Sequence, residues 1–320
     1  MDPPIRLSAH QTVEKEAHQA QPNVHARSSH VLQKRTITWS ELPEWMKDNE
    51  YIISGYRREL RSWLACFHSI FGYLHNETVN IHTHLYGTVL FLFLLSSFEA
   101  TYFAGYESVT VLDRAVFAIF LLSAVFCLSS STLFHTAHAH SQKASQYTKV
   151  SLKCNLLDYS AIVVLIVGSF FPCIYYAFYC ERIYQVTYLL VMTTAGLSAA
   201  CIVLSSQYSS KANRHARTYV FIALGLSGIL PVSHALVSHG FHKLNVEMGF
   251  HWLLTSATLY IAGALLYANR IPECFAPGKF DYFFASHQIF HVAVVGGALC
   301  HYACILTAFD HWHRQEGICR

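Results

Sequence analysis

Long uncharged apolar runs separated by short polar loops dominate the chain from residue 85 onward. A bilayer core of about 30 Å needs roughly 20 apolar residues in a helix, so runs of this length predict membrane-spanning helices. The qualifying runs lie at residues 85–102, 115–134, 156–178, 184–205, 219–237, 250–268 and 287–308. Glu99 interrupts the end of the first run, which is the shortest. The pattern predicts an all-α bundle of seven transmembrane helices.

The segment before the first run mixes aromatic and charged residues. From Trp63 onward its apolar positions, such as Phe67 and Phe71, recur at helical spacing, which predicts an amphipathic helix in the membrane interface. A soluble helix packed on cytosolic loops is the alternative. We therefore expect a disordered cytosolic tail over 1–38, a cytosolic or interfacial helical segment over 39–84, the bundle over 85–308 and a short outer tail over 309–320.

Composition supports a membrane protein, because 53% of the 320 residues are hydrophobic and only 13% are charged. The net charge of +3 is small and dispersed, which argues against nucleic-acid binding. The polar amino-terminal tail lacks the apolar stretch of a signal peptide. Ten cysteines include no CxxC pair, and five of them lie in apolar runs, where we expect buried free thiols (Cys127, Cys173, Cys201, Cys300 and Cys304).

The distribution of lysine and arginine predicts the orientation of the bundle. The amino-terminal segment and the loops after the second, fourth and sixth runs carry most of these residues, whereas the alternate loops carry only Arg114, Arg182 and Lys243. Because positive charge collects in the cytosol, the amino terminus is expected inside and the carboxyl terminus outside. This topology is opposite to that of G-protein-coupled receptors. We expect a multi-pass integral protein of the plasma membrane, with an endomembrane as the alternative location.

Ionisable residues inside spans are costly and mark candidate sites. His135 ends the second run, Asp158 lies near the start of the third, and His287 and His291 open the seventh. Given the alternating direction of the spans, all four fall at the cytosolic end. The four-residue spacing of His287 and His291 places both imidazoles on one helix face. With His135 they form a three-histidine set that suits zinc (Zn2+) with water in the fourth position, although copper or iron would be tolerated.

Two neighbouring residues are candidates for catalysis beside this set. Asp158 could orient the water or take its proton, and Ser131, one helical turn before His135, could donate a hydrogen bond. The alternatives are structural. Ser131 could bond a carbonyl of its own helix, and Asp158 could cap the third helix or pair with Lys153.

Other histidines compete as ligands. His82 and His84 start the first span and could replace His135, or could simply lie at the interface. His301 and His234 map toward the outer side, which is too far for the same ion.

Several ordered motifs resemble one known family. They are LPEW at 42–45 with KDN at 47–49, HNETVNI at 75–81, STLFH at 131–135, LDYS at 157–160, PGKFD at 277–281 and SHQIFH at 286–291. Over residues from about Trp39 to Tyr302 the chain is similar to the progestin and adipoQ receptor family. In particular it resembles the adiponectin-receptor and fungal zinc-homeostasis branch of that family, which is related to haemolysin III.

The resemblance implies a seven-helix bundle that holds zinc through His135, His287 and His291, with Asp158 contacting the water on the zinc. The adiponectin-receptor branch is associated with hydrolysis of ceramide to sphingosine and fatty acid. The same pattern, with Ser131, is similar to that of alkaline ceramidases. The implied partners are a membrane lipid, ceramide or fatty acid, in an intramembrane cavity, and an extracellular protein ligand is left open.

Three functions are compatible with these residues. The first hypothesis is a zinc-dependent amide hydrolase acting on a ceramide-like lipid and coupled to lipid and zinc-homeostasis signalling. The second is a non-catalytic seven-helix receptor with a structural zinc. A zinc transporter is the weakest, because it requires further ionisable groups near the bilayer midplane and the central parts of the spans offer almost none.

Overall fold

The computed structural model describes residues 35–140, 150–205, 213–316 and 319, and its helices confirm the predicted all-α bundle with seven spans. The expected tail over 1–38 lies outside the described residues except for its last four positions. The helices of the bundle are α2 (Thr78–Thr101), α3 (Val111–Ala137), α4 (Val150–Ala177), α5 (Arg182–Leu204), α6 (Arg214–Leu226), α7 (Ile229–His239), α8 (Phe241–Met248), α9 (Phe250–Asn269) and α10 (Ser286–Arg314). The fifth span combines α6 and α7, which are separated by a break at Ser227 and Gly228.

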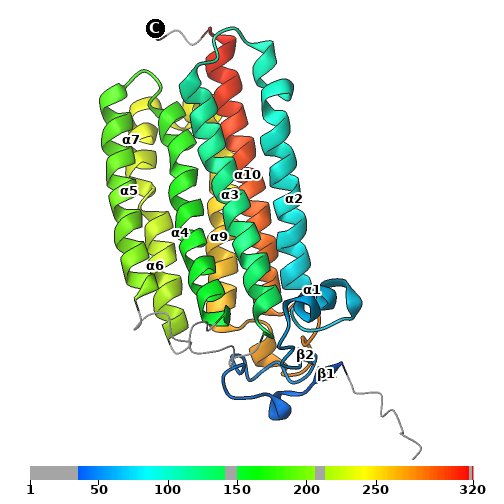
Figure 1. The fold of residues 1–320 in the computed structure, drawn as a ribbon. Coiled ribbons are helices and arrows are strands. Elements are labelled where there is room, and N and C mark those ends of the chain that lie inside the picture. Colours follow the sequence, from blue (N-terminus) through cyan, green and yellow to red (C-terminus); the bar gives the residue numbers. More distant parts are fainter. Residues whose placement is uncertain (1–34, 141–149, 206–212, 317–318, 320) are drawn as a thin grey trace, which may run out of the picture. The chain divides into compact units, whose positions relative to one another are not determined.

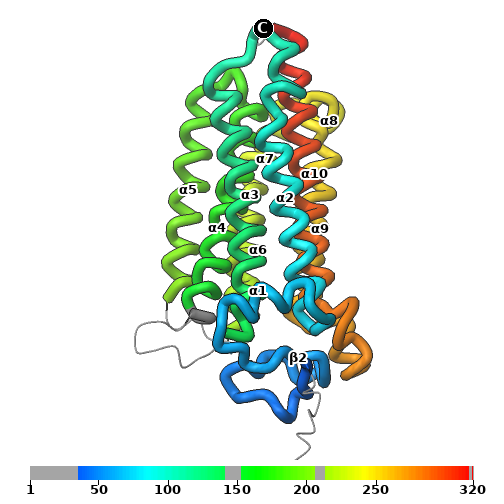
Figure 2. Tube along the Cα trace, turned by 45° about the vertical axis from the view of Figure 1, so that its right-hand side comes forward, coloured from blue at the N-terminus to red at the C-terminus, as the bar shows by residue number. Residues whose placement is uncertain are grey.

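Neighbouring helices pack side by side around the bundle, and the last helix completes it (Figures 1 and 2). Helices α2 to α6 are in contact in chain order, α2 with α3, α3 with α4, α4 with α5 and α5 with α6. Helix α6 also contacts α9, and α10 contacts α9, α2 and α4. The core between them is rich in aromatic residues such as Phe117, Phe120 and Phe309, which are almost completely buried. This arrangement brings the start of α10 near the end of α3, although about 150 residues separate them in sequence.

The outward faces of the spans are apolar. Large side chains such as Phe93, Leu190 and Val237 are more than half exposed. A water-soluble protein would bury such a surface, whereas lipid solvates it without cost. The chain is therefore an integral multi-pass membrane protein.

The residues before the first span form a folded cap. We call residues 35–62 the cap segment; it contains a two-stranded antiparallel sheet of β1 (Thr36–Ile37) and β2 (Tyr56–Arg57) and a 3-10 turn, η1 (Trp39–Glu41). Its small core is formed by Leu42, Met46, Ile52 and Tyr56. The core also includes Ala139, just after the end of α3, and Ala285, just before the start of α10. The cap segment thus packs on the end of the bundle where α3 ends and α10 begins, which we call the site end.

Helix α1 (Trp63–Gly72) follows the cap segment and confirms the predicted amphipathic helix. Cys66 and Ser69 on one side are buried, whereas Leu64 and Phe71 on the other are more than two-thirds exposed. An apolar face this open suits the lipid interface better than packing on a cytosolic loop. Between residues 39 and 62 the chain is not helical apart from η1, so the helical part of this segment is shorter than expected.

A disulfide joins Cys180, after α4, to Cys319, after α10. Helices α4 and α10 both end at the opposite end of the bundle from the cap segment (Figure 1). The five cysteines expected to be free are free, but only Cys127 and Cys304 are buried, whereas Cys173 and Cys300 are half-buried and Cys201 is exposed. Disulfides persist in oxidising compartments, so the pairing agrees with the predicted outer position of this end. The orientation itself stays a prediction.

Candidate metal centre

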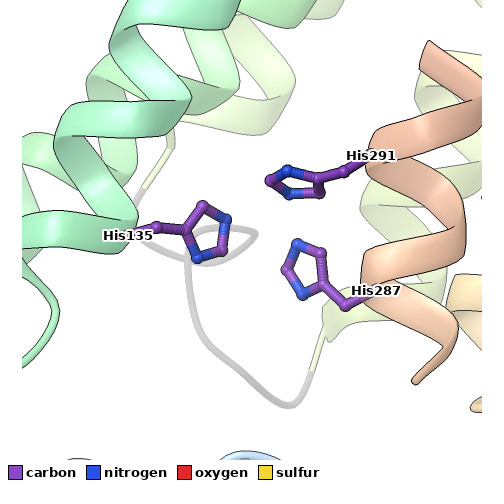
Figure 3. A group of neighbouring side chains, drawn as sticks. All are labelled: His135, His287 and His291. Atoms are coloured by element: carbon purple, nitrogen blue, oxygen red, sulfur yellow. The ribbon is translucent and has the colours of Figure 1, made fainter. Parts of the chain in front are cut away.

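Three imidazoles meet at the site end of the bundle (Figure 3). His135 projects from the last turn of α3, and His287 and His291 project from the first two turns of α10. One ring nitrogen from each lies within 4.8 Å of the others, and the ring centroids are 4.7 to 4.9 Å apart. The structure therefore brings together the three histidines singled out in the sequence, and these buried or half-buried side chains could bind a metal ion. We call them the histidine cluster.

Glu77 orients the first histidine. Its Oε2 lies 2.7 Å from Nδ1 of His135, so the other ring nitrogen, Nε2, faces the cluster. That Nε2 is buried and makes no hydrogen bond within the described part of the chain. Burial by itself would raise the pKa of Glu77, but the charge and hydrogen bond of His135 outweigh it and hold the pKa well below its ordinary value. A carboxylate that receives the outer N–H of an imidazole is the usual support of a metal-binding histidine.

Other contacts orient His291 and His287. Nδ1 of His291 lies 3.1 Å from the backbone oxygen of Asn80, which leaves Nε2 for the cluster. His287 lies against the ring of Tyr267, with centroids 4.7 Å apart. The buried carboxylate of Glu273 accepts the backbone N–H of Ser286 at 2.7 Å, where acidic groups stabilise a helix N-terminus. This contact anchors the turn of α10 that carries His287.

Sequence reasoning placed His84 among the competing ligands, and the structure gives it another position. Its ring is buried and stacks on His291 at 3.8 Å between centroids, with an interplanar angle of 19°. His84 thus covers a face of that imidazole, and the group that could hold a metal does not include it. His82 is turned toward Phe71 and Tyr86 instead.

The proposed catalytic pair also lies at this end. Asp158 and Ser131 are both nearly buried, and Asp158 interacts with the Ser131 hydroxyl and with the charge of His135. Among the described residues no ion pair joins Asp158 to Lys153, whose side chain is exposed. Both residues line the same cavity as the histidine cluster.

Two histidines farther along the spans make hydrogen bonds to neighbouring helices. Nε2 of His301 contacts the backbone oxygen of Ser169 at 2.9 Å, and Nδ1 of His234 bonds the Tyr188 hydroxyl at 3.0 Å. These contacts agree with their exclusion from the cluster. Glu77, by contrast, was missed as an orienting residue. Two sequence signals point to it: Glu77 belongs to the HNETVNI motif at 75–81, and it is an acidic group directly before a span that starts at the same end as the histidines.

The fold and the histidine cluster together define an integral membrane protein of seven helices with a buried three-histidine centre suited to a metal ion. The chain belongs to the haemolysin-III-related family, whose sequence model matches residues 72–302. This match confirms the family resemblance found in the sequence motifs.

Similar proteins that carry a name support the same family assignment. The chain is 42% identical over 84% of its length to progestin and adipoQ receptor-like protein 1 of Caenorhabditis elegans, and 40% identical over 82% to the adiponectin receptor protein of Drosophila melanogaster. It covers only 59% and 57% of these two proteins. It is also 34% identical to the ADIPOR-like receptor IZH2 of Saccharomyces cerevisiae, over 93% of this chain and 92% of that protein.

Proposed function

We propose that this protein is a zinc-dependent amide hydrolase acting on a ceramide-like lipid, in a signalling context like that suggested by its receptor-named relatives. The observation that carries the proposal is that the histidine cluster, Asp158 and Ser131 all line one cavity that continues into the apolar interior of the bundle. A purely structural metal site is normally closed, whereas a catalytic site keeps one position open to its substrate.

The donor set of the cluster fits zinc. Imidazole nitrogens suit Zn²⁺, and Nε2 of His135 is a buried nitrogen without a hydrogen bond in the described residues. If each of the three histidines supplies one nitrogen, a four-coordinate zinc ion would keep its fourth position for water or substrate. A zinc ion held here would supply a Lewis acid for an amide carbonyl and would acidify a water molecule.

The cavity suits a lipid. Its volume is about 710 Å³, and its walls include residues of α4 from Asp158 to Ala177. At a rise of 1.5 Å per residue this stretch is about 28 Å long, close to the full hydrocarbon thickness of a bilayer. Apolar side chains such as Leu165, Ile166 and Phe170 cover that wall. An acyl chain could therefore extend from the histidine cluster into the bundle.

The residues around the cluster have separable roles in amide hydrolysis. The Asp158 carboxylate would accept a proton from the attacking water as it adds to the carbonyl carbon, and would return it to the nitrogen as the C–N bond breaks. The Ser131 hydroxyl would donate a hydrogen bond to the carbonyl oxygen as negative charge develops there. The products are a sphingoid amine and a fatty acid.

A second candidate is a receptor in which the metal is structural. The names of the relatives, which contain the word receptor, favour it. In this case the lipid in the cavity would act as a ligand. A protein ligand on the outer face, a place in the plasma membrane and a link to zinc homeostasis remain proposals that both candidates share.

The deciding experiment uses purified protein reconstituted in lipid, with ceramide carrying a labelled acyl chain. We expect the wild type to contain zinc and to release labelled fatty acid. Asp158→Ala should keep its zinc and lose hydrolysis, whereas the His287→Ala, His291→Ala double variant should lose both. His82→Ala is the matched control, because its ring lies outside the cluster.

Two outcomes would contradict parts of the proposal. A zinc-loaded wild type that releases no fatty acid would reject the hydrolase in favour of the receptor. Equal zinc in the wild type and the double histidine variant would remove the metal centre altogether.

A further inference from the structure

Arg57 is an arginine of the cap segment whose side chain lies inside the protein. It is only 2% exposed and is among the largest fully buried side chains. Its guanidinium reaches the end of α3, where it donates to the backbone oxygens of His135 at 2.5 Å and Thr136 at 3.1 Å. A third bond, of 3.0 Å, goes to the hydroxyl of Ser69 on α1.

The chemistry of these contacts explains the choice of arginine. The last four carbonyls of a helix have no partner within the helix, and α3 ends at Ala137, so the oxygens of His135 and Thr136 need donors from elsewhere. A planar guanidinium can bond two adjacent oxygens at once, and its charge is favourable at a helix C-terminus. Burial lowers the pKa of Arg57, and the nearby charge of Glu77 opposes this effect. An arginine retains its charge under such conditions.

Burying a guanidinium costs free energy, which its hydrogen bonds must offset. These bonds stabilise the part of the chain that carries His135. His287 and His291 lie on consecutive turns of one continuous helix, which fixes their relative position. His135 is alone on the last turn of α3, where helices fray. Its ring is oriented by Glu77, but its backbone is held by Arg57.

We propose that Arg57 is a positioning residue of the metal centre, which fixes the last turn of α3 so that His135 meets the two histidines of α10. This inference rests on the proposed metal binding and adds the cap segment to the centre as a structural part. The cap segment is itself fixed to the other side of the site. The Asp281 carboxylate, in the loop before α10, accepts the backbone N–H groups of Ile53 and Ser54 at 2.8 Å. Arg57 thus completes a connection from the start of α10, through the cap segment, to the end of α3.

The test measures metal retention rather than catalysis. Zinc is titrated away from the 320-residue protein with a chelator of known affinity, and the absorption spectrum of the cobalt-substituted protein reports the ligand geometry. Losing a partner that is hydrogen-bonded directly to a metal ligand typically weakens metal binding by about 10- to 100-fold. Arg57 holds the backbone of His135 rather than its ring, so we expect a loss near the lower limit, about 10-fold. We expect that loss in Arg57→Gln, together with an altered cobalt spectrum of the folded variant. The metal-free variant should also melt below the metal-free wild type, because the backbone oxygens of His135 and Thr136 lose their buried donor.

Two further variants make the result specific. Arg61→Gln is the control, because Arg61 is an exposed arginine of the same segment that pairs with Glu59. It should bind metal as the wild type does. Arg57→Lys should give an intermediate affinity, because one ammonium cannot hold both carbonyls and Ser69 in the same geometry.

Each outcome is decisive. If the wild type holds no metal, the proposed function fails. If the wild type holds metal and Arg57→Gln holds it equally tightly with an unchanged cobalt spectrum, the metal centre stands and the role of Arg57 is rejected. If Arg57→Gln does not fold, Arg57→Lys decides, and wild-type affinity in that variant rejects the role.

Discussion

The contact between Glu77 and His135 predicts how strongly the proposed centre would hold zinc. Oε2 of Glu77 receives Nδ1–H of His135 at 2.7 Å and also the side-chain amide of Asn80 at 2.8 Å. Glu77→Gln keeps the size of the side chain and one acceptor but removes the charge. Glu77→Ala removes the acceptor as well, and leaves two donors in a nearly buried place without a partner.

The structure sets the size of the effect. The Glu77 side chain is 17% exposed and that of His135 3%, so solvent screens their pairing only weakly. Loss of such a supporting carboxylate costs about 10- to 100-fold in metal affinity, or about 1.4 to 2.7 kcal/mol. An unpaired buried donor costs about 1 to 3 kcal/mol, which agrees with this range. We expect Glu77→Gln near the lower limit and Glu77→Ala near the upper limit.

The assay is competition for zinc between purified protein and a chelator, at constant pH and ionic strength. The matched control is Glu99→Gln, because Glu99 is an exposed carboxylate that pairs with Arg114 at the other end of α2. That control should leave zinc binding unchanged. Wild-type zinc affinity in Glu77→Ala would refute the reasoning, because it would mean that the orientation of His135 does not depend on the carboxylate.

Three further predictions concern stability. Burial lowers the pKa of His75 to about 3, so between pH 6.5 and that value the unfolded chain binds a proton that the folded protein excludes. Stability should therefore fall as pH decreases, by up to about 1.4 kcal/mol per pH unit, and this slope should flatten in His75→Gln. Replacing Cys180 and Cys319 together by serine should cost about 2 to 4 kcal/mol of unfolding free energy, seen as a lower melting temperature. Gly168→Ala should cost about 1 to 3 kcal/mol, because its new Cβ would lie 2.7 Å from Cβ of Ser123 where α4 crosses α3.

Matched controls test each mechanism. His68→Gln should leave the pH slope unchanged, since His68 is exposed on α1. Cys201→Ser should leave the melting temperature unchanged, because that thiol is free and exposed. Gly105→Ala should be tolerated, since nothing lies within 4 Å of the position its Cβ would take. A control that shifts stability as much as its test variant contradicts the corresponding explanation.

The seven spans could be predicted from sequence because lipid imposes one simple requirement, namely a long run of apolar residues in a helix. The residues at which those helices begin and end could not be predicted in this way. The first span was expected to start at residue 85, but α2 begins at Thr78, and α10 continues past the expected end at residue 308 to Arg314. Hydropathy detects the part of a helix that lies in lipid, whereas the polar turns beyond it are stabilised by contacts with the cap segment and neighbouring helices.

The candidate site was likewise predictable from sequence only in part. Sequence by itself determined that His135, His287 and His291 lie at one end of the bundle, because the direction of each span follows from their order. Only the tertiary structure decided that Glu77 and Arg57 hold His135, that His84 stacks on His291 rather than joining the cluster, and that Cys180 pairs with Cys319. The physical reason is that periodicity and hydropathy describe one helix at a time. The partners of a buried charge, ring or thiol come from other segments, and the packing of those segments determines which of them meet.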